Sequence, residues 1–223
     1  TDHYQPSLLT EFLYHDDGKI KNEVFFYGSF IQSKMFHKGG TCSDCHEPHS
    51  LKLRAEGNGV CLQCHRAVKF DQPSHHFHKN GDVGAQCAEC HMPQTTYMGV
   101  DGRHDHSIRI PRPDLSLKIK TPNACTNCHE DKTAQWANDK VEAWYGEDWS
   151  PGWHFGETLY EQRKGVSTAG QDLAAIAASV KLPSIARATA ATSLSSATGP
   201  LTLVVVKSIV KDKDPMLRLA ALQ

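Results

Sequence analysis

The sequence lacks long hydrophobic runs, blocks of basic residues, and any cysteine outside one repeated motif. Its longest apolar run, Leu201 to Val206, is far shorter than the roughly 18 residues of a membrane span, so we expect no membrane-spanning helix. Charged residues make up an ordinary 22%, and no basic block indicates a nucleic-acid partner. The opening TDHYQPSLLT has neither the basic nor the apolar region of a signal peptide.

Apolar residues are also slightly scarce. Counted with Gly and without Tyr, they make up about 43% of the chain, against the roughly 45–50% that is usual in globular proteins. A chain of 223 residues allows one or two domains. The side chains alone therefore supply only a thin core.

Cysteine and histidine are, by contrast, abundant and arranged in a pattern. The chain has 8 Cys and 14 His, and every Cys belongs to a C-x-x-C pair that is followed at once by His. The four segments are CSDCH, CLQCH, CAECH and CTNCH. Four such motifs that use every Cys do not arise by chance at this composition, so the pattern reports chemistry.

The C-x-x-C-H motif is typical of c-type haem attachment. Its two thiols add across the two vinyl groups of haem, and the adjacent His binds the iron. We therefore predict four covalently attached haem c groups, each with its iron. The predicted thioether residues are Cys42, Cys45, Cys61, Cys64, Cys87, Cys90, Cys125 and Cys128. The predicted proximal iron ligands are His46, His65, His91 and His129.

Three other uses of the cysteines explain the pattern less well. Two Cys₄ zinc sites or four disulfides leave the His after every pair without a reason. A dithiol redox centre needs only one C-x-x-C pair and no trailing His.

The other ten histidines supply candidate second ligands. They are His3, His15, His37, His49, His75, His76, His78, His104, His106 and His154. With so many available, we favour bis-His, low-spin, low-potential irons over His/Met ligation, which would raise the potential. His49, His78 and His106 are the preferred distal ligands, and the fourth stays open among His76, His37, His15 and His75. An iron with two protein ligands has no open position for a substrate.

The predicted fold class is mainly α with much irregular loop. Four haems within 88 residues leave too little chain for layered secondary structure, so the haems themselves form the core. We predict a tetrahaem cytochrome domain over 1–135, with 1–41 as a lead-in segment that wraps the haems. Within that segment EVFFYGSFI, at 23–31, fits a short strand or a helix equally well. Residues 136–223 are predicted to form an α-helical tail.

A helix is predicted just after the last motif, with Asp131 or Thr133 as its N-cap. Trp136, Val141 and Trp144 share one face at helical spacing, and we interpret the two Trp as core residues rather than electron relays. From about 171 the chain is rich in Ala, Leu and Val. There LPSIARATAA (182–191) is similar to DPMLRLAALQ (214–223), with Arg187 over Arg218 and Ala190 over Ala221 at an offset of 31.

A repeat of this length suggests a HEAT or tetratricopeptide solenoid, with a plain helical hairpin as the alternative. A solenoid needs further repeats and a cap, so we expect the native chain to extend past Gln223.

The long stretch from GAQCAECHMP to CTNCHEDKTAQWA resembles the multihaem cytochromes of the double-CxxCH type that carry a tetratricopeptide or HEAT-like tail. YHDDGKI, YGSFIQSKM and CSDCHEPHSLKLRAEGN resemble the same family. The resemblance favours His78, His106, His49 and His15 as distal ligands. Its members usually carry further CxxCH motifs upstream, so this chain resembles a C-terminal portion. The last motifs also resemble pentahaem nitrite reductase, whose catalytic CxxCK does not occur here.

Three hypotheses for function follow. The favoured one is a non-enzymatic electron carrier, with redox proteins as partners, whose subunits stack head to tail into an extracellular conductive filament. The second is a reductase of a small nitrogen oxide, or its electron-donating subunit, which requires a five-coordinate haem. The third is a binding module in which the tail docks a partner. Haem is attached outside the cytoplasm, so we expect a periplasmic or extracellular protein whose signal peptide has been removed.

Overall fold

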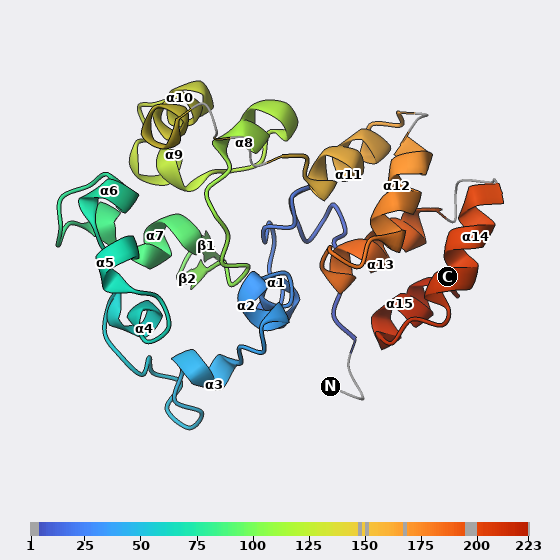
Figure 1. The fold of residues 1–223 in the computed structure, drawn as a ribbon, viewed down its shortest axis with the longest axis horizontal. Coiled ribbons are helices and arrows are strands. Elements are labelled where there is room, and N and C mark those ends of the chain that lie inside the picture. Colours follow the sequence, from blue (N-terminus) through green and yellow to red (C-terminus); the bar gives the residue numbers. More distant parts are fainter. Residues whose placement is uncertain (1–4, 147–148, 150–151, 167–168, 195–199, 223) are drawn as a thin grey trace. The chain divides into compact units, whose positions relative to one another are not determined.

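The computed structural model describes residues 5–146, 149, 152–166, 169–194 and 200–222. Its elements are mainly short helices joined by long loops, with one two-stranded sheet (Figure 1), which confirms the predicted fold class. The chain divides into two compact units. One comprises 1–33, 117–121 and 151–223, and the other comprises 34–116 and 122–150. In the described part of the chain no helix is long and apolar enough to cross a membrane.

The unit of residues 34–116 and 122–150 contains all four CxxCH motifs, and we call it the motif unit. Its helices are α2 (Lys34–His37), α3 (Cys42–Cys45), α4 (Gly59–Leu62), α5 (Ala67–Phe70), α6 (Pro73–His76), η1 (Val83–Ala85), α7 (Cys87–His91), α9 (Ala124–Cys128) and α10 (Ala134–Tyr145). Helix α8 (Pro113–Ile119) has residues in both units. Among the described helices that lie wholly in this unit, only α10 exceeds two turns.

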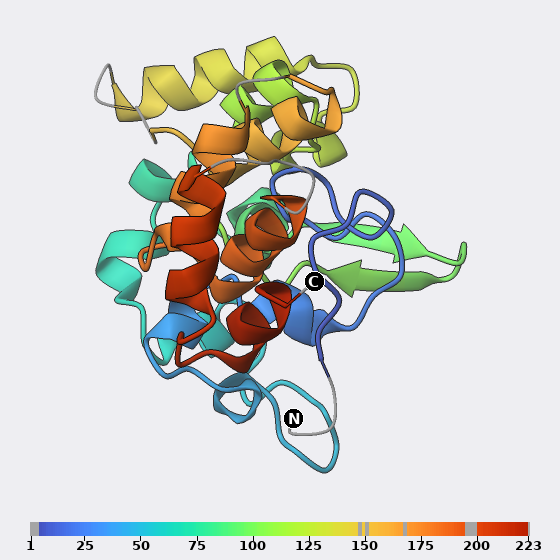
Figure 2. The same cartoon turned by 90° about the vertical axis from the view of Figure 1, so that its right-hand side faces the viewer.

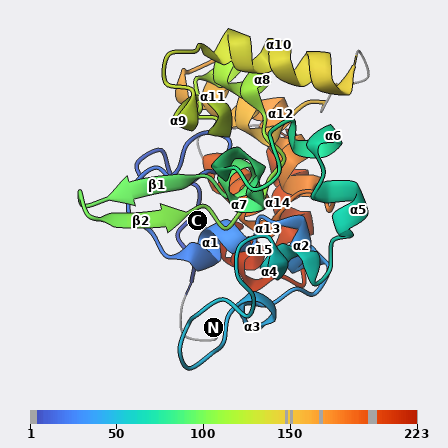
Figure 3. The same ribbon diagram turned by 90° about the vertical axis from the view of Figure 1, so that its left-hand side faces the viewer.

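Strands β1 (Gln94–Tyr97) and β2 (Asp101–His104) form an antiparallel hairpin of the motif unit (Figure 3). The register pairs Gln94 with His104 and Tyr97 with Asp101. Met98 and Gly99, with φ of 51° and 73°, make the turn. Two successive positive φ values match the twist of the flanking strands, as in other tight hairpins.

Helix α10 begins as predicted. Of the two candidate caps, Thr133 is the N-cap, and its Oγ1 accepts the N–H of Trp136 at 3.1 Å. Val141 and Ala137 lie buried on one face of the helix, whereas Trp136 and Trp144 are only half-buried.

The second unit holds α1 (Phe26–Phe30), α11 (Phe155–Arg163), α12 (Ala169–Ala178), α13 (Ser184–Ser193), α14 (Pro200–Ile209) and α15 (Pro215–Ala220), and we call it the tail unit. The segment at 23–31, which fitted strand or helix, forms α1. Most of the large, fully buried side chains belong here, among them Leu159, Ile176, Ile185 and Leu217. Ordinary apolar packing therefore stabilises this unit.

Residues 5–33 belong to the tail unit. Arg163 of α11 donates hydrogen bonds to the Asp16 carboxylate and to the Leu9 carbonyl, each at 2.5 Å. Thr189 of α13 accepts the N–H of Leu9 at 3.0 Å. The boundaries of the compact units therefore differ from the predicted boundary after 135. The reason is that the lead-in segment makes these hydrogen bonds with α11 and α13.

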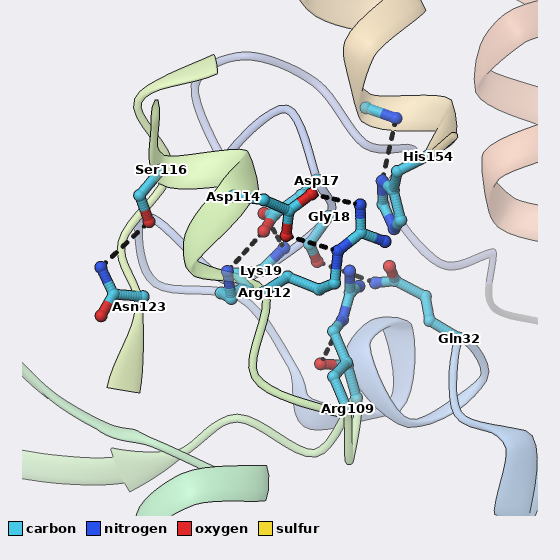
Figure 4. Close-up of polar contacts among 12 residues, drawn as sticks. Asp17, Gly18, Lys19, Gln32, Arg109, Arg112, Asp114, Ser116, Asn123 and His154 are labelled. Carbon is cyan, nitrogen blue, oxygen red and sulfur yellow. Dashed lines mark hydrogen bonds and ion pairs between the residues drawn. The ribbon is translucent and has the colours of Figure 1, made fainter. Parts of the chain in front are cut away.

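Polar contacts also fold the lead-in segment onto itself. Lys19 pairs with the buried Asp17, and the Gln32 amide donates to the Gly18 carbonyl at 3.0 Å (Figure 4). The Gln32 amide also donates to the carbonyl of Gly28 on α1, likewise at 3.0 Å. The buried carboxylate and amide thus have partners, as buried polar groups require.

The offset of 31 reappears in three dimensions. Helices α12 and α14 begin 31 residues apart, as do α13 and α15. Equivalent helices contact each other, α12 with α14 and α13 with α15, so two helical hairpins stack (Figure 2, orange and red). Arg187 bonds to the Ala177 carbonyl and Asp212, and its counterpart Arg218 bonds to the Asp212 and Lys213 carbonyls. The assignment to the tetratricopeptide or HEAT class stays a prediction.

Candidate functional site

Each CxxCH motif is wound into a single helical turn. The His N–H donates to the carbonyl of the first Cys in three motifs, at 2.9 Å from His46, 3.0 Å from His65 and 2.9 Å from His129. In the remaining motif, α7 extends from Cys87 to His91. Residues at i, i+3 and i+4 share one helix face, so both sulfurs and the His project to the same side. One planar group can bond to both sulfurs and lie beside that His.

The second and third motifs are tied together by one amide. The side chain of Asn58, just before α4, donates to the Ala85 carbonyl and to Asp71, both at 2.9 Å. Its oxygen accepts the N–H of Cys87 at 2.8 Å. Three hydrogen bonds from a single half-buried residue fix α4 against the start of α7.

The thiols of successive motifs lie close together. The Cys61 thiol donates a hydrogen bond to the Cys87 sulfur, which raises the pKa of Cys61 and lowers that of Cys87 to about 7. Burial raises the pKa of Cys45, with smaller contributions from Asp44 and from Cys64 of the next motif.

The cysteines of the third and fourth motifs also lie close together. Burial raises the pKa of Cys90 to about 11, with further contributions from Cys125 and Cys128. Helices α7 and α9, which carry these residues, are in contact.

Three of the four motif histidines face another histidine. The ring centroids of His46 and His106 are 6.3 Å apart, those of His91 and His75 are 6.1 Å apart, and those of His129 and His78 are 6.3 Å apart. The angles between the ring planes are 29°, 10° and 28°, respectively. The fourth, His65, has an edge-to-face contact with Phe70 at 5.5 Å.

This spacing is what two imidazoles on opposite sides of one iron require. A metal–nitrogen bond of about 2 Å, plus about 1.1 Å from nitrogen to ring centre, gives about 6.2 Å between centroids when doubled. The same centroid distance is too long for face-to-face stacking of two rings. The observed 6.1–6.3 Å therefore fits an iron between the rings of each pair.

Hydrogen bonds to carbonyls orient four of these imidazoles. Nδ1 of His46 donates to Leu51 at 3.0 Å, and Nδ1 of His91 donates to Arg109 at 2.6 Å. The rings of His106 and His78, which face two of the motif histidines, likewise donate to the carbonyls of residues 104 and 76. A proton fixed on Nδ1 leaves the lone pair on Nε2, the atom that binds iron.

Burial lowers the pKa of both His106 and His75, which favours the neutral, ligating form.

The loop after β2 supplies both a facing imidazole for one motif His and a carbonyl that orients another. His106 faces His46, and three residues later Arg109 orients His91 of the third motif. The Arg109 side chain donates to Ser107 at 2.7 Å, which ties the loop to itself. Farther along, Arg112 pairs with Asp114, and Asn123 donates to Ser116 just before α9 (Figure 4).

The other predicted distal ligands lie elsewhere. His37 ends α2 and has an edge-to-face contact with Phe36, and His49 is exposed in the loop after α3. His15 belongs to the tail unit, where burial lowers its pKa. Nδ1 of His76 accepts the N–H of His78 at 3.2 Å, which favours the proton on Nε2 rather than a ligating lone pair.

Of the remaining spare histidines, two have structural contacts and one is not described. The ring of His104 donates to the carbonyl of Met92, and His154 caps α11 by accepting the N–H of Gly156. His3 lies outside the described residues. His75, which the sequence left among the alternatives, faces His91. The sequence feature that points to His75 as a candidate ligand is its position three residues before His78.

The motif unit also has the surroundings that a haem requires. Of the largest side chains that are fully buried among the described residues, only Leu115 belongs to this unit. Val68 and Val83, 79% and 67% exposed, lie near the motifs in sequence without protein cover. Nε2 of His76 is buried without a hydrogen-bond partner among the described residues. Such a unit fits haem, which supplies both apolar surface and carboxylate acceptors.

Comparison with known proteins agrees with these observations. The family model "Cytochrome c552" matches residues 69–189, and the model "Doubled CXXCH motif" matches residues 35–70. No curated protein matches the chain.

Among solved structures, the chain is similar to "Outer Cell Wall Cytochrome OcwA", with 16% identity and a TM-score of 0.39. That alignment covers 95% of this chain and 53% of the other, so the chain spans about half the length of that cytochrome.

The cytochrome c552 match extends over more than half of the residues and includes the third and fourth motifs. The chain therefore belongs to the cytochrome c552 family: it is a c-type cytochrome whose CxxCH motifs bind haem c covalently.

Proposed function

We propose that this protein is a tetrahaem electron carrier, in which each of the four CxxCH motifs holds one haem c. The observation that carries the proposal is the set of three imidazole pairs at 6.1–6.3 Å, each of which joins a motif His to a distant His. All eight Cys belong to the motifs, so four attachment sites use them completely.

The roles of the residues follow from their positions. The two thiols of each motif form thioether bonds, and the motif His binds iron from the proximal side. His106, His75 and His78 bind from the distal side at the first, third and fourth motifs, respectively. Bound haem c supplies reversible one-electron chemistry at its iron. Two imidazoles on an iron keep it low-spin and low-potential.

The order of the motifs in space supports a relay. Cys45 of the first motif lies near Cys64 of the second, and Cys61 contacts Cys87 of the third. Contact between α7 and α9 joins the third motif to the fourth. Each attachment site therefore has its sequence neighbours beside it, which gives a continuous path of closely spaced sites.

The second motif is the one whose distal ligand stays a choice between His37 and His49. Single substitution of each by Ala tests the choice. The variant that converts the haem at His65 from low-spin to high-spin identifies the ligand. If neither does so, this part of the proposal fails.

We propose that the protein is not an enzyme. The alternative is a reductase of a small nitrogen oxide, or the electron-donating subunit of one. One observation favours the alternative: among the described residues, the ring contact of His65 is with Phe70 rather than with a second imidazole. A wholly low-spin spectrum of the isolated holoprotein, without carbon monoxide binding to the reduced form, supports the carrier. High-spin ferric haem with nitrite turnover would support the reductase.

The proposed partners are redox proteins and further copies of this chain, stacked head to tail into a filament outside the cell. The proposed location is periplasmic or extracellular, because haem is attached outside the cytoplasm. Electron microscopy over a range of protein concentrations tests the filament. Filaments that lengthen with concentration support it, and a strictly monodisperse monomer excludes it.

Intact-mass measurement on the isolated protein tests the haem number. We expect the mass of the polypeptide plus four haems. Paired Cys→Ala substitution in any one motif is expected to remove one haem and leave three. A wild-type count below four would contradict the proposal.

A further inference from the structure

Helix α10 contacts both imidazoles of the fourth pair. The ring of Trp136 lies 4.9 Å from that of His129, and the ring of Trp144 lies 6.5 Å from that of His78, edge to face. The two tryptophans are eight residues apart, which is about 12 Å along a helix. One rigid element therefore reaches the motif His with its first turn and the facing His with its last.

The C-terminal end of α10 also fixes the backbone that carries His78. Trp144 stacks on Phe77 with centroids 4.6 Å apart and ring planes only 2° apart. Phe77 ends α6 with φ 56° and ψ 27°, a left-handed conformation that residues other than Gly adopt at a cost. The stacked indole offsets that cost and so keeps the turn that aims the next residue at His129.

Tyr145 extends the same contact to the third pair. Its hydroxyl donates a hydrogen bond to the His75 carbonyl at 2.8 Å, and its ring has an edge-to-face contact with Phe77 at 5.8 Å. His75 faces His91 of the third motif. Two adjacent residues of α10 thus contact the segment that presents distal ligands to two neighbouring sites.

The helix itself is anchored independently of these contacts. Ala137 and Val141 are buried, and the Thr133 cap fixes its first turn just after the fourth motif. α10 also packs on α9, whose C-cap is His129 (Figure 3). The spacing between Trp136 and Trp144 is therefore a fixed length.

We propose that α10 is a positioning element for the axial ligands of the fourth haem, with Trp136, Trp144 and Tyr145 as positioning residues. It holds His129 and His78 at the separation that one iron requires, and it anchors the His75 segment of the third site. This inference rests on the proposed bis-His ligation. It predicts that α10 sets the spin state and potential of the fourth haem without taking part in haem attachment.

The test compares Trp144→Ala, Trp144→Phe and Tyr145→Phe in the complete holoprotein. Lys140→Ala, which changes an exposed residue of the same helix, is the matched control. Trp144→Ala is expected to keep four covalent haems by mass. Carbon monoxide binding to its reduced form is expected to rise by up to one haem per chain above wild type. Trp144→Phe is expected to restore near wild-type binding, because a phenyl ring still stacks on Phe77.

Tyr145→Phe is expected to shift the midpoint potential of one haem while all haems stay low-spin. If Trp144→Ala and Tyr145→Phe leave carbon monoxide binding and all potentials unchanged in a four-haem protein, the positioning role is excluded. If Trp144→Ala and Lys140→Ala alter them equally, α10 contributes only general stability, which also overturns the inference. A wild-type protein with fewer than four haems would instead contradict the proposed function.

Discussion

The imidazoles of His78 and His129 face each other with centroids 6.3 Å apart, although α7 and the β1–β2 hairpin lie between them in the sequence. His129 follows a CxxC pair, whereas no motif marks His78. In this pair the motif therefore specifies one imidazole, and chain folding specifies the other.

His106 and its neighbour His104 allow a matched test of distal ligation at the first site. Only His106 faces His46, whereas His104 donates to the Met92 carbonyl. His106→Ala is expected to convert one haem in four to high-spin, measured by absorption and electron paramagnetic resonance. His104→Ala is expected to leave the spin state unchanged. Equal effects of the two substitutions would contradict the assignment of His106.

Replacement of the same ligand by Met tests the potential. His106→Met is expected to raise the midpoint potential of one haem by on the order of 0.1 V, within the roughly 0.8 V range that axial ligands cover. The reason is that a thioether favours the reduced iron more than an imidazole does. A potentiometric titration measures the change, and an unaltered titration curve would argue against ligation by residue 106.

Gly84 packs so closely against the His78 imidazole that no larger residue fits there. A Cβ at this position would lie 2.4 Å from Cδ2 and 2.8 Å from Nε2 of His78. Gly84→Ala is therefore expected to displace the imidazole, lower stability by about 1–3 kcal/mol as overpacking does, and leave one haem high-spin. Gly102→Ala is the control, because its Cβ would meet only the flexible end of Gln94. A low-spin Gly84→Ala protein would show that His78 is not a ligand.

Asn58 joins the second and third motifs through three hydrogen bonds. Asn58→Ala leaves the N–H of Cys87 and the carbonyl of Ala85 without these partners. We expect a loss of about 1–3 kcal/mol in the free energy of unfolding, measured by denaturant titration. Gln63→Ala, which removes a single exposed hydrogen bond to the Val60 carbonyl, is expected to have a much smaller effect.

Asp212 makes the stability of the tail unit depend on pH. A hydrogen bond from the Asp214 N–H and the Arg187 guanidinium hold the pKa of Asp212 below its usual 3.8. A depressed pKa stabilises the folded state above pH 3.8, and this contribution is lost as pH falls through the folded-state pKa.

Circular dichroism is therefore expected to show a thermal midpoint that falls more steeply below pH 4 in the wild type than in Asp212→Asn. Parallel curves for the two proteins would contradict the role of this carboxylate.

Local sequence patterns establish the attachment chemistry, because covalent bonding to haem needs Cys and His at a fixed local spacing that one helical turn satisfies. They also establish the mainly helical class, a helix capped by Asp131 or Thr133, and the offset of 31 between the helical hairpins. These are short-range properties, so a pattern of neighbouring residues is sufficient to reveal them.

The choice of the distant histidines that face the motif histidines depends, by contrast, on the folded chain. His75 and His76 are adjacent and chemically identical, yet the left-handed turn at Phe77 and the hydrogen bond into His76 separate their roles. The packing of residues 5–33 on α11 and α13 was likewise decided by buried contacts such as Arg163 with Asp16. Both outcomes depend on residues far apart in sequence, whose approach is fixed by the packing and hydrogen bonding of the whole unit.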